Sequence, residues 1–260
     1  MSDTPQQSAG PPLQWLARAQ TSALLFLAAA AWAATLIVAR GMTGMTGTMG
    51  FGIAAFVAVW TLMMAAMMLP SVAPLASVYA RTVRDSRAVR LSSLVAGYLV
   101  VWAIAGGPAY GLARLTSWLD SYHPAVAHGA AIAVFAGCGI YQLTGLKDRC
   151  LAHCRSPFGL LLRYGSFRGR TKDLRVGAHH GAYCLGCCWA LMLVLIAVGV
   201  MNIVAMVALA ILILVEKVSP REQLIARLAG VAALGLAVAT IWLPWLAPGL
   251  QAARPLMMGS

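Results

Sequence analysis

Five of the six cysteines, together with two histidines, fall in two short segments of the chain. In order, the segments contain Cys150, His153 and Cys154, and then His180, Cys184, Cys187 and Cys188. Ligands recur three or four residues apart, so each set shares one face if its segment is helical, with the last cysteine beside that face. Thiolate and imidazole together are ligands that Cu(I) or Zn(II) selects. The pattern predicts a metal site; a redox dithiol and inert packing are the alternatives.

Methionines form a second group of soft ligands. One set, Met42, Met45 and Met49, is spaced by glycine and threonine, and a second set within an apolar run is Met63, Met64, Met67 and Met68. The second set forms two i, i+4 pairs, each on one helical face. Thioethers are soft donors that bind Cu(I), although gap filling between helices is the alternative for the second set. Burial does not account for the first set, so we expect an exposed loop there.

Long apolar runs must position these ligands. The chain of 260 residues is 61% hydrophobic and 10% charged, with a mean hydropathy of +0.80, whereas about a quarter of a soluble domain is charged. A span needs about 20 apolar residues, and the candidates are 22–39, 51–78, 91–112, 127–146, 181–200, 203–218 and 224–246. We therefore expect an all-α, polytopic transmembrane helix bundle of about seven spans, with an uncleaved first helix. Residues 1–20 are expected to form a disordered leader, 21–246 the transmembrane domain and 247–260 a short tail.

Basic residues indicate the orientation of these spans. Of the 19 lysines and arginines, only Arg40, Arg114 and Arg254 fall on one side of the expected topology. The positive-inside rule then places the N-terminus and both cysteine segments on the cytoplasmic side, where thiols stay reduced. The methionine loop falls on the outer side. Topology and anionic lipid explain the net charge of +12 better than a nucleic-acid partner does.

Polar groups within the runs are few. Glu216 and Lys217 end one run and are expected to be exposed or paired. Four polar residues are expected to bond across helices, namely Gln142, Ser71, Thr61 and Asn202. The sequence contains no carboxylate pair within a span, phosphate loop, nucleophile elbow or HExxH motif. An enzymatic activity is therefore not favoured.

Three blocks resemble the DUF2182 family of bacterial membrane proteins, which are described as predicted metal-binding and similar to polyphenol-oxidase-associated copper chaperones. The blocks are 60–74 (WTLMMAAMMLPSVAP), 150–162 (CLAHCRSPFGLLL) and 177–202 (GAHHGAYCLGCCWALMLVLIAVGVMN). The resemblance covers roughly residues 20–246 and carries the ligand pattern onto the cysteines, histidines and second methionine set above. Relatives often have an acidic outer loop of the form Met-Asp-Met, which this chain replaces with threonine and glycine spacers.

The residues and the resemblance together predict a multi-pass protein of the bacterial inner (plasma) membrane that handles Cu(I) for delivery or transport in metalloenzyme assembly. Its expected surroundings are the lipid bilayer, and its expected partner is a copper enzyme or a periplasmic metallochaperone. One alternative is a thiol-redox or assembly module that uses Cys184, Cys187 and Cys188. Another is a helper subunit with structural Zn(II).

Overall fold

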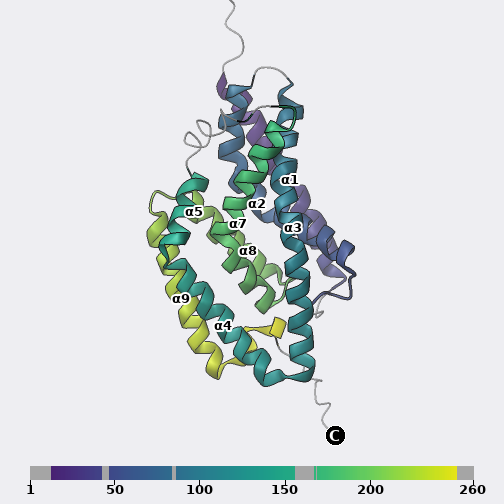
Figure 1. Ribbon diagram of the computed structural model, residues 1–260, viewed down its shortest axis with the longest axis vertical. Coiled ribbons are helices and arrows are strands. Elements are labelled where there is room, and N and C mark those ends of the chain that lie inside the picture. The colour runs from purple at the N-terminus through teal and green to yellow at the C-terminus, as the bar shows by residue number, and fades with distance from the viewer. Residues whose placement is uncertain (1–12, 43–46, 84–85, 156–166, 168, 251–260) are drawn as a thin grey trace, which may run out of the picture.

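The computed structural model of the protein describes residues 13–42, 47–83, 86–155, 167 and 169–250, with side chains described from residue 21 onward (Figure 1). Within these ranges all regular structure is helical. The helices are α1 (Leu13–Arg40), α2 (Ile53–Thr82), α3 (Arg87–Tyr122), α4 (Pro124–Gln142), α5 (Gly145–Arg155), α7 (Lys172–Val198), α8 (Ile203–Val218) and α9 (Glu222–Trp242), followed by the 3-10 turns η1 (Pro244–Leu246) and η2 (Pro248–Leu250). The expected all-α bundle is confirmed.

Six of the described helices are long and apolar enough to cross a bilayer. They are α1 from Thr21, α2, α3, α4, α7 and α9. Helix α8 is apolar but has only 16 residues, or roughly 24 Å at 1.5 Å per residue. The fold is therefore that of a multi-pass membrane protein with six full-length spans and one shorter apolar helix, where the sequence suggested about seven spans.

The helices associate in pairs that Figure 1 shows along the length of the molecule. Helix α1 packs on α2, α3 on α7, and α4 on α9, while α5 and α8 contact α7 between these pairs. Trp118, near the C-terminal end of α3, and Trp242, at the C-terminal end of α9, are both exposed, and Figure 1 shows these two helix ends at the same end of the bundle. Tryptophan is favoured at a membrane–water interface, so this end of the bundle is suited to lie at the membrane surface.

Helix α7 begins at Lys172, nine residues before the expected start of its span. The added turns are held by Asp173, which accepts hydrogen bonds from Arg90 at 3.0 and 3.1 Å and from the Tyr79 hydroxyl. The charged residues there suggested a connecting loop, but the ion pair of Arg90 with Asp173 lets the helix continue. As a result, Cys184 lies near the middle of α7 instead of at its start.

Helices α3 and α7 approach each other through two glycines. A Cβ atom on Gly177 would lie 1.8 Å from the carbonyl oxygen of Leu94, and one on Gly97 would lie 2.0 Å from that of Leu174. Both obstacles are backbone atoms, which cannot rotate away as a side chain can. The absence of two side chains therefore sets the distance between the two helices.

The substitution Gly177→Ala is expected to lower stability, because the added methyl group must push α3 and α7 apart. Overpacking of this kind costs about 1–3 kcal/mol, which corresponds to roughly 2–10 °C in melting temperature for a protein of this size. Thermal unfolding in detergent micelles measures the change. Gly107→Ala on α3 is the matched control, since a Cβ atom there meets nothing within 4 Å. Equal effects of the two substitutions would contradict the close approach.

Candidate metal centre

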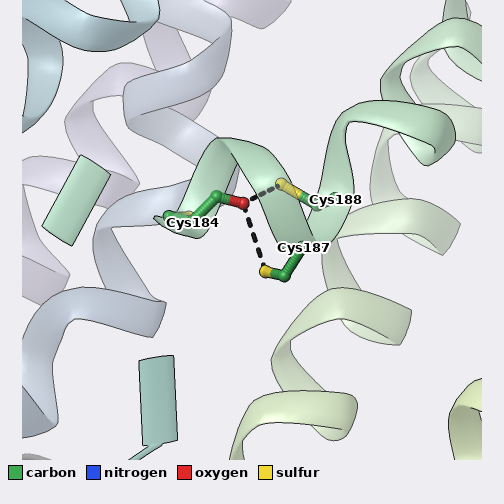
Figure 2. Close-up of side chains that lie close together, drawn as sticks. All are labelled: Cys184, Cys187 and Cys188. Atoms are coloured by element: carbon green, nitrogen blue, oxygen red, sulfur yellow. Dashed lines mark hydrogen bonds between the residues drawn. The ribbon is translucent and has the colours of Figure 1, made fainter. Parts of the chain in front are cut away.

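Helix α7 places three thiols together in the protein interior. Cys184, Cys187 and Cys188 are at most 1% exposed, and their sulfur atoms lie within 4.8 Å of one another. Figure 2 shows how helical spacing produces this cluster: the thiols of Cys187 and Cys188 both donate to the carbonyl oxygen of Cys184, at 3.1 and 2.9 Å. The prediction that these three cysteines lie together is confirmed. We call them the thiol cluster.

The cysteines of α5 lie beside the thiol cluster. The sulfur of Cys154 is 4.0 Å from that of Cys187, and the sulfur of Cys150 lies against Gly186, 3.2 Å from where a Cβ atom would stand. The hydrogen bond to Cys187 raises the pKa of Cys154 well above its ordinary value, and burial raises that of Cys150. The raised pKa values favour the thiol form of both cysteines, and a metal ion that binds them displaces the proton.

The two histidines predicted as ligands, His153 and His180, lie near the thiol cluster but do not belong to its compact group of ligand atoms. His180 is buried one turn before Cys184, and its Nδ1 has no hydrogen-bond partner among the described residues. Its ring centroid is 6.1 Å from that of Tyr98. His153 is half-buried and stacks on Tyr183, with 3.6 Å between ring centroids.

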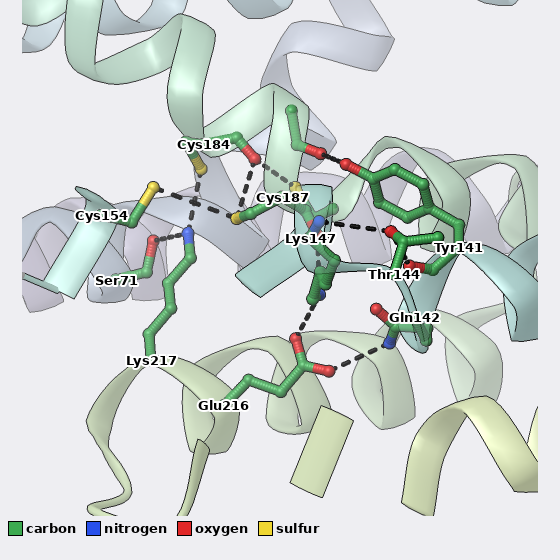
Figure 3. Close-up of polar contacts among 12 residues, drawn as sticks. Ser71, Tyr141, Gln142, Thr144, Lys147, Cys154, Cys184, Cys187, Glu216 and Lys217 are labelled. Carbon is green, nitrogen blue, oxygen red and sulfur yellow. Dashed lines mark hydrogen bonds and ion pairs between the residues drawn. The ribbon is translucent and has the colours of Figure 1, made fainter. Parts of the chain in front are cut away.

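Lys217 brings an ammonium group to the thiol cluster. Its Nζ donates to the sulfur of Cys184 at 2.9 Å and to the hydroxyl of Ser71 at 3.1 Å (Figure 3). The Tyr98 hydroxyl lies 3.0 Å from the same sulfur. A cation beside a sulfur stabilises that sulfur as a thiolate, which is the form that binds metal. Tyr98 was not predicted, because its contact joins residues 86 positions apart and no local pattern signals it.

A second ammonium group lies on the other side of the thiol cluster. Lys147 is 0% exposed, and its Nζ donates at 2.7 Å to the backbone carbonyl of Cys187 and at 2.7 Å to Glu216. Gln142 completes the network by donating to the second oxygen of Glu216 at 3.0 Å (Figure 3). The network joins α4, α5, α7 and α8 around the thiol cluster.

Only part of this network was predicted. The expected cross-helix bonding of Gln142 and Ser71 is confirmed, as is the pairing of Glu216. The expectation of cross-helix bonding was wrong for Thr61, which donates to the carbonyl of Val57 in its own helix, and for Asn202, which accepts from the Ala205 N–H at the start of α8.

An exposed position for Glu216 was wrong, since it is 1% exposed. Lys147 was assigned only to topology, because a lysine directly after an apolar run is typical of a loop on the cytoplasmic side. Its position three residues before Cys150 was the signal that could have linked it to the site.

The four methionines of α2 are all buried, at 0–2% exposed, in the same apolar core as the thiol cluster. Met67 lines a cavity of about 220 Å³ where α2 faces Trp32 of α1 and Val207 of α8. Burial at a helix interface is compatible both with packing and with thioether coordination. These methionines therefore lie in one apolar core with the thiols.

The expectation of an exposed methionine loop was wrong for Met49, which is 5% exposed. Left-handed backbone at Gly47 and Met49 turns the loop back onto the bundle, and a Cβ atom on Gly47 would meet the hydroxyl of Ser117 on α3 at 1.6 Å. Met42 is half-buried against the core. Met45 lies outside the described residues. Packing of the loop on α3 thus accounts for Met49 without a metal.

Six apolar helices around a buried group of thiols define a multi-pass membrane protein with a candidate soft-metal site. A family model described as PpoB2, copper chaperone, matches residues 57–240. Because the match covers most of the chain, the protein belongs to the PpoB2 copper chaperone family, and the resemblance to DUF2182, which is the same family, is confirmed. The matched range contains both cysteine segments and the α2 methionines. Comparison with curated proteins and with solved structures gives no match.

The substitution Glu216→Gln is expected to lower the free energy of unfolding by about 3–5 kcal/mol, because it leaves the Lys147 ammonium buried without a counter-charge. Adding Lys147→Met removes that charge and should recover most of the loss. Denaturant or thermal unfolding of the two single variants and the double variant measures the coupling.

The ion pair of Arg155 with Glu222 is the matched control, since its side chains are 20% and 30% exposed. Glu222→Gln should cost less than about 1 kcal/mol, as exposed pairs do. Additive effects of the Lys147 and Glu216 substitutions would show that the buried pair does not act as a unit.

Proposed function

We propose that the protein binds Cu(I) at the thiol cluster, within the bacterial inner membrane, and passes it on for the assembly of a copper enzyme. The observation that carries the proposal is the position of three buried sulfurs within 4.8 Å of one another in a member of a copper chaperone family. In this proposal copper is the cargo of the protein. The partner is a copper enzyme or a periplasmic metallochaperone.

The donor set suits Cu(I) chemically. Thiolates are soft ligands that select Cu(I). The three sulfurs are close enough to bind one ion together after small side-chain rotations. Cys154, whose sulfur is 4.0 Å from that of Cys187, is a fourth thiol to which the ion can transfer. Four thiols could also form a closed tetrahedral Zn(II) site, and the family description is what favours copper.

Electrostatics around the thiol cluster support a monovalent cation. Thiolates in an interior without water need a compensating positive charge. Lys217 supplies one such charge at the sulfur of Cys184. The bound ion supplies the second, so that a singly charged ion with two or three thiolates leaves little net charge in the bilayer.

The α2 methionines give this proposal a route across the membrane. The i, i+4 pairs of thioethers lie in the same core as the thiol cluster, and thioethers bind Cu(I) more weakly than thiolates do. We propose that they conduct the ion between the thiol cluster and the outer face. The excess of basic residues on the side opposite the outer face supports a cytoplasmic N-terminus.

Metal analysis of the purified protein tests the thiol cluster. Anaerobically loaded protein is expected to retain about one equivalent of Cu(I) against a chelator, with at least tenfold weaker binding in Cys184→Ser and in Cys187→Ser. The matched control is Cys138→Ser, because Cys138 is a buried cysteine of α4 outside the thiol cluster.

Two other results would contradict the Cu(I) proposal and identify a different function. No bound metal, together with a reversible disulfide involving Cys184, would identify a thiol-redox module. Tightly held zinc that resists exchange with Cu(I) would identify a structural site.

The double substitution Met64→Leu with Met68→Leu is expected to slow the loading of the thiol cluster several-fold when Cu(I) is supplied at the outer face of reconstituted vesicles, while leaving its Cu(I) affinity unchanged. Leucine preserves the packing at a cost below about 1.5 kcal/mol but removes the thioether sulfur. The control is Met206→Leu, a fully buried methionine of α8. Equal loading rates in all three proteins would limit the α2 methionines to packing.

A further inference from the structure

Two histidines on neighbouring helices face each other beside the thiol cluster. His153 of α5 and His179 of α7 have ring centroids 5.7 Å apart, at an angle of 58° between the ring planes. Both side chains are half-buried, whereas the cluster sulfurs are fully buried. The pair therefore lies nearer the surface of the protein than the cluster sulfurs do.

The separation of the two rings suits a shared metal ion. An ion about 2.0 Å from a ring nitrogen lies roughly 3.2 Å from the ring centroid, so two imidazoles on one ion have centroids about 5–6.4 Å apart. The observed 5.7 Å lies within this range. Imidazole is a borderline donor that binds copper ions.

Aromatic contacts hold the two rings in this arrangement. Tyr183 stacks on His153 at 3.6 Å between centroids and lies 5.1 Å from His179, while Phe167 contacts His179 edge-on at 6.2 Å. Packing of this kind limits ring rotation and so preorganises the donors. Tyr183 also directly precedes Cys184, which fixes the rings relative to the thiol cluster.

The residues next in sequence lead inward from both histidines. Cys154 follows His153, and its sulfur is 4.0 Å from that of Cys187. His180 follows His179 and is buried, with an Nδ1 that lacks a hydrogen-bond partner among the described residues. On both helices, therefore, one step along the chain leads from a half-buried imidazole to a donor next to the thiol cluster.

Building on the proposed copper function, we propose that His153 and His179 form a second copper site, which loads the thiol cluster. The ion remains Cu(I) throughout. Each step of loading breaks a copper–nitrogen bond and forms a copper–sulfur bond, and the imidazole nitrogen that the ion leaves accepts the thiol proton and passes it to water at the surface. Thiolate is the softer ligand, so the histidine pair binds more weakly and the ion moves inward. His179, which is not among the ligands predicted from the sequence, becomes a ligand in this arrangement.

The test uses the full-length protein in detergent micelles, loaded anaerobically with Cu(I). The variant His153→Phe with His179→Phe keeps two aromatic rings in the stack but removes all four ring nitrogens. The control is His123→Phe with His128→Phe, which changes two histidines at the junction of α3 and α4. Copper stoichiometry, X-ray absorption at the copper edge and the rate of transfer from a Cu(I) donor are the measurements.

Wild-type protein and the control are expected to bind a second, weaker equivalent of copper with nitrogen ligands. The phenylalanine variant should lose this equivalent, keep the sulfur-bound one, and load the thiol cluster at least tenfold more slowly. Retention of the second equivalent and of the wild-type loading rate would overturn the histidine site while leaving the thiol cluster intact. Absence of any sulfur-bound copper in wild-type protein would overturn the proposed function and this inference with it.

Discussion

The ion pair between Lys147 and Glu216 ties three helices together where no water can do so. Lys147 belongs to α5, Glu216 to α8, and the same ammonium holds the backbone carbonyl of Cys187 on α7. Because both charges are buried, neither can be satisfied if the helices separate. The contact between Cys154 and the thiol cluster depends on this, since α5 is only 11 residues long and has little apolar surface of its own to hold it in place.

The two lysines at the site have different electrostatic roles. Lys147 is neutralised by Glu216, so it contributes structure and little net charge. Lys217 forms no ion pair with a carboxylate among the described residues and instead donates to a sulfur and a hydroxyl. Its charge is therefore available to the thiol cluster. An intramembrane ammonium without a carboxylate partner is costly, and a thiolate or a thiolate–metal complex is the group that offsets the cost here.

Local patterns in the sequence predicted the helices and the thiol cluster, because both follow from backbone geometry. Cysteines at i, i+3 and i+4 must share a helical face, and apolar runs must be helical in a bilayer. The surroundings of the cluster could not be predicted in this way. The bond from Lys147 to Glu216 joins residues 69 positions apart, and Met49 is buried by a turn in which Gly47 lies so close to α3 that a Cβ atom would not fit. Such features depend on how the helices pack, which periodicity does not encode.

The glycine contact between α3 and α7 also constrains how the protein can move. At Gly97 and Gly177 the backbones of α3 and α7 touch, so the two helices cannot approach further without a steric clash. They also cannot separate without losing many van der Waals contacts at once. This close contact holds the part of α7 that carries the thiol cluster in place. Helix α5 is the element least held by apolar packing, since it has 11 residues and is tied to α7 and α8 by the bonds of Lys147, so we expect an ion to reach the sulfurs from the α5 side by displacement of that helix. Helices α3 and α7 would then stay in place while α5 moves.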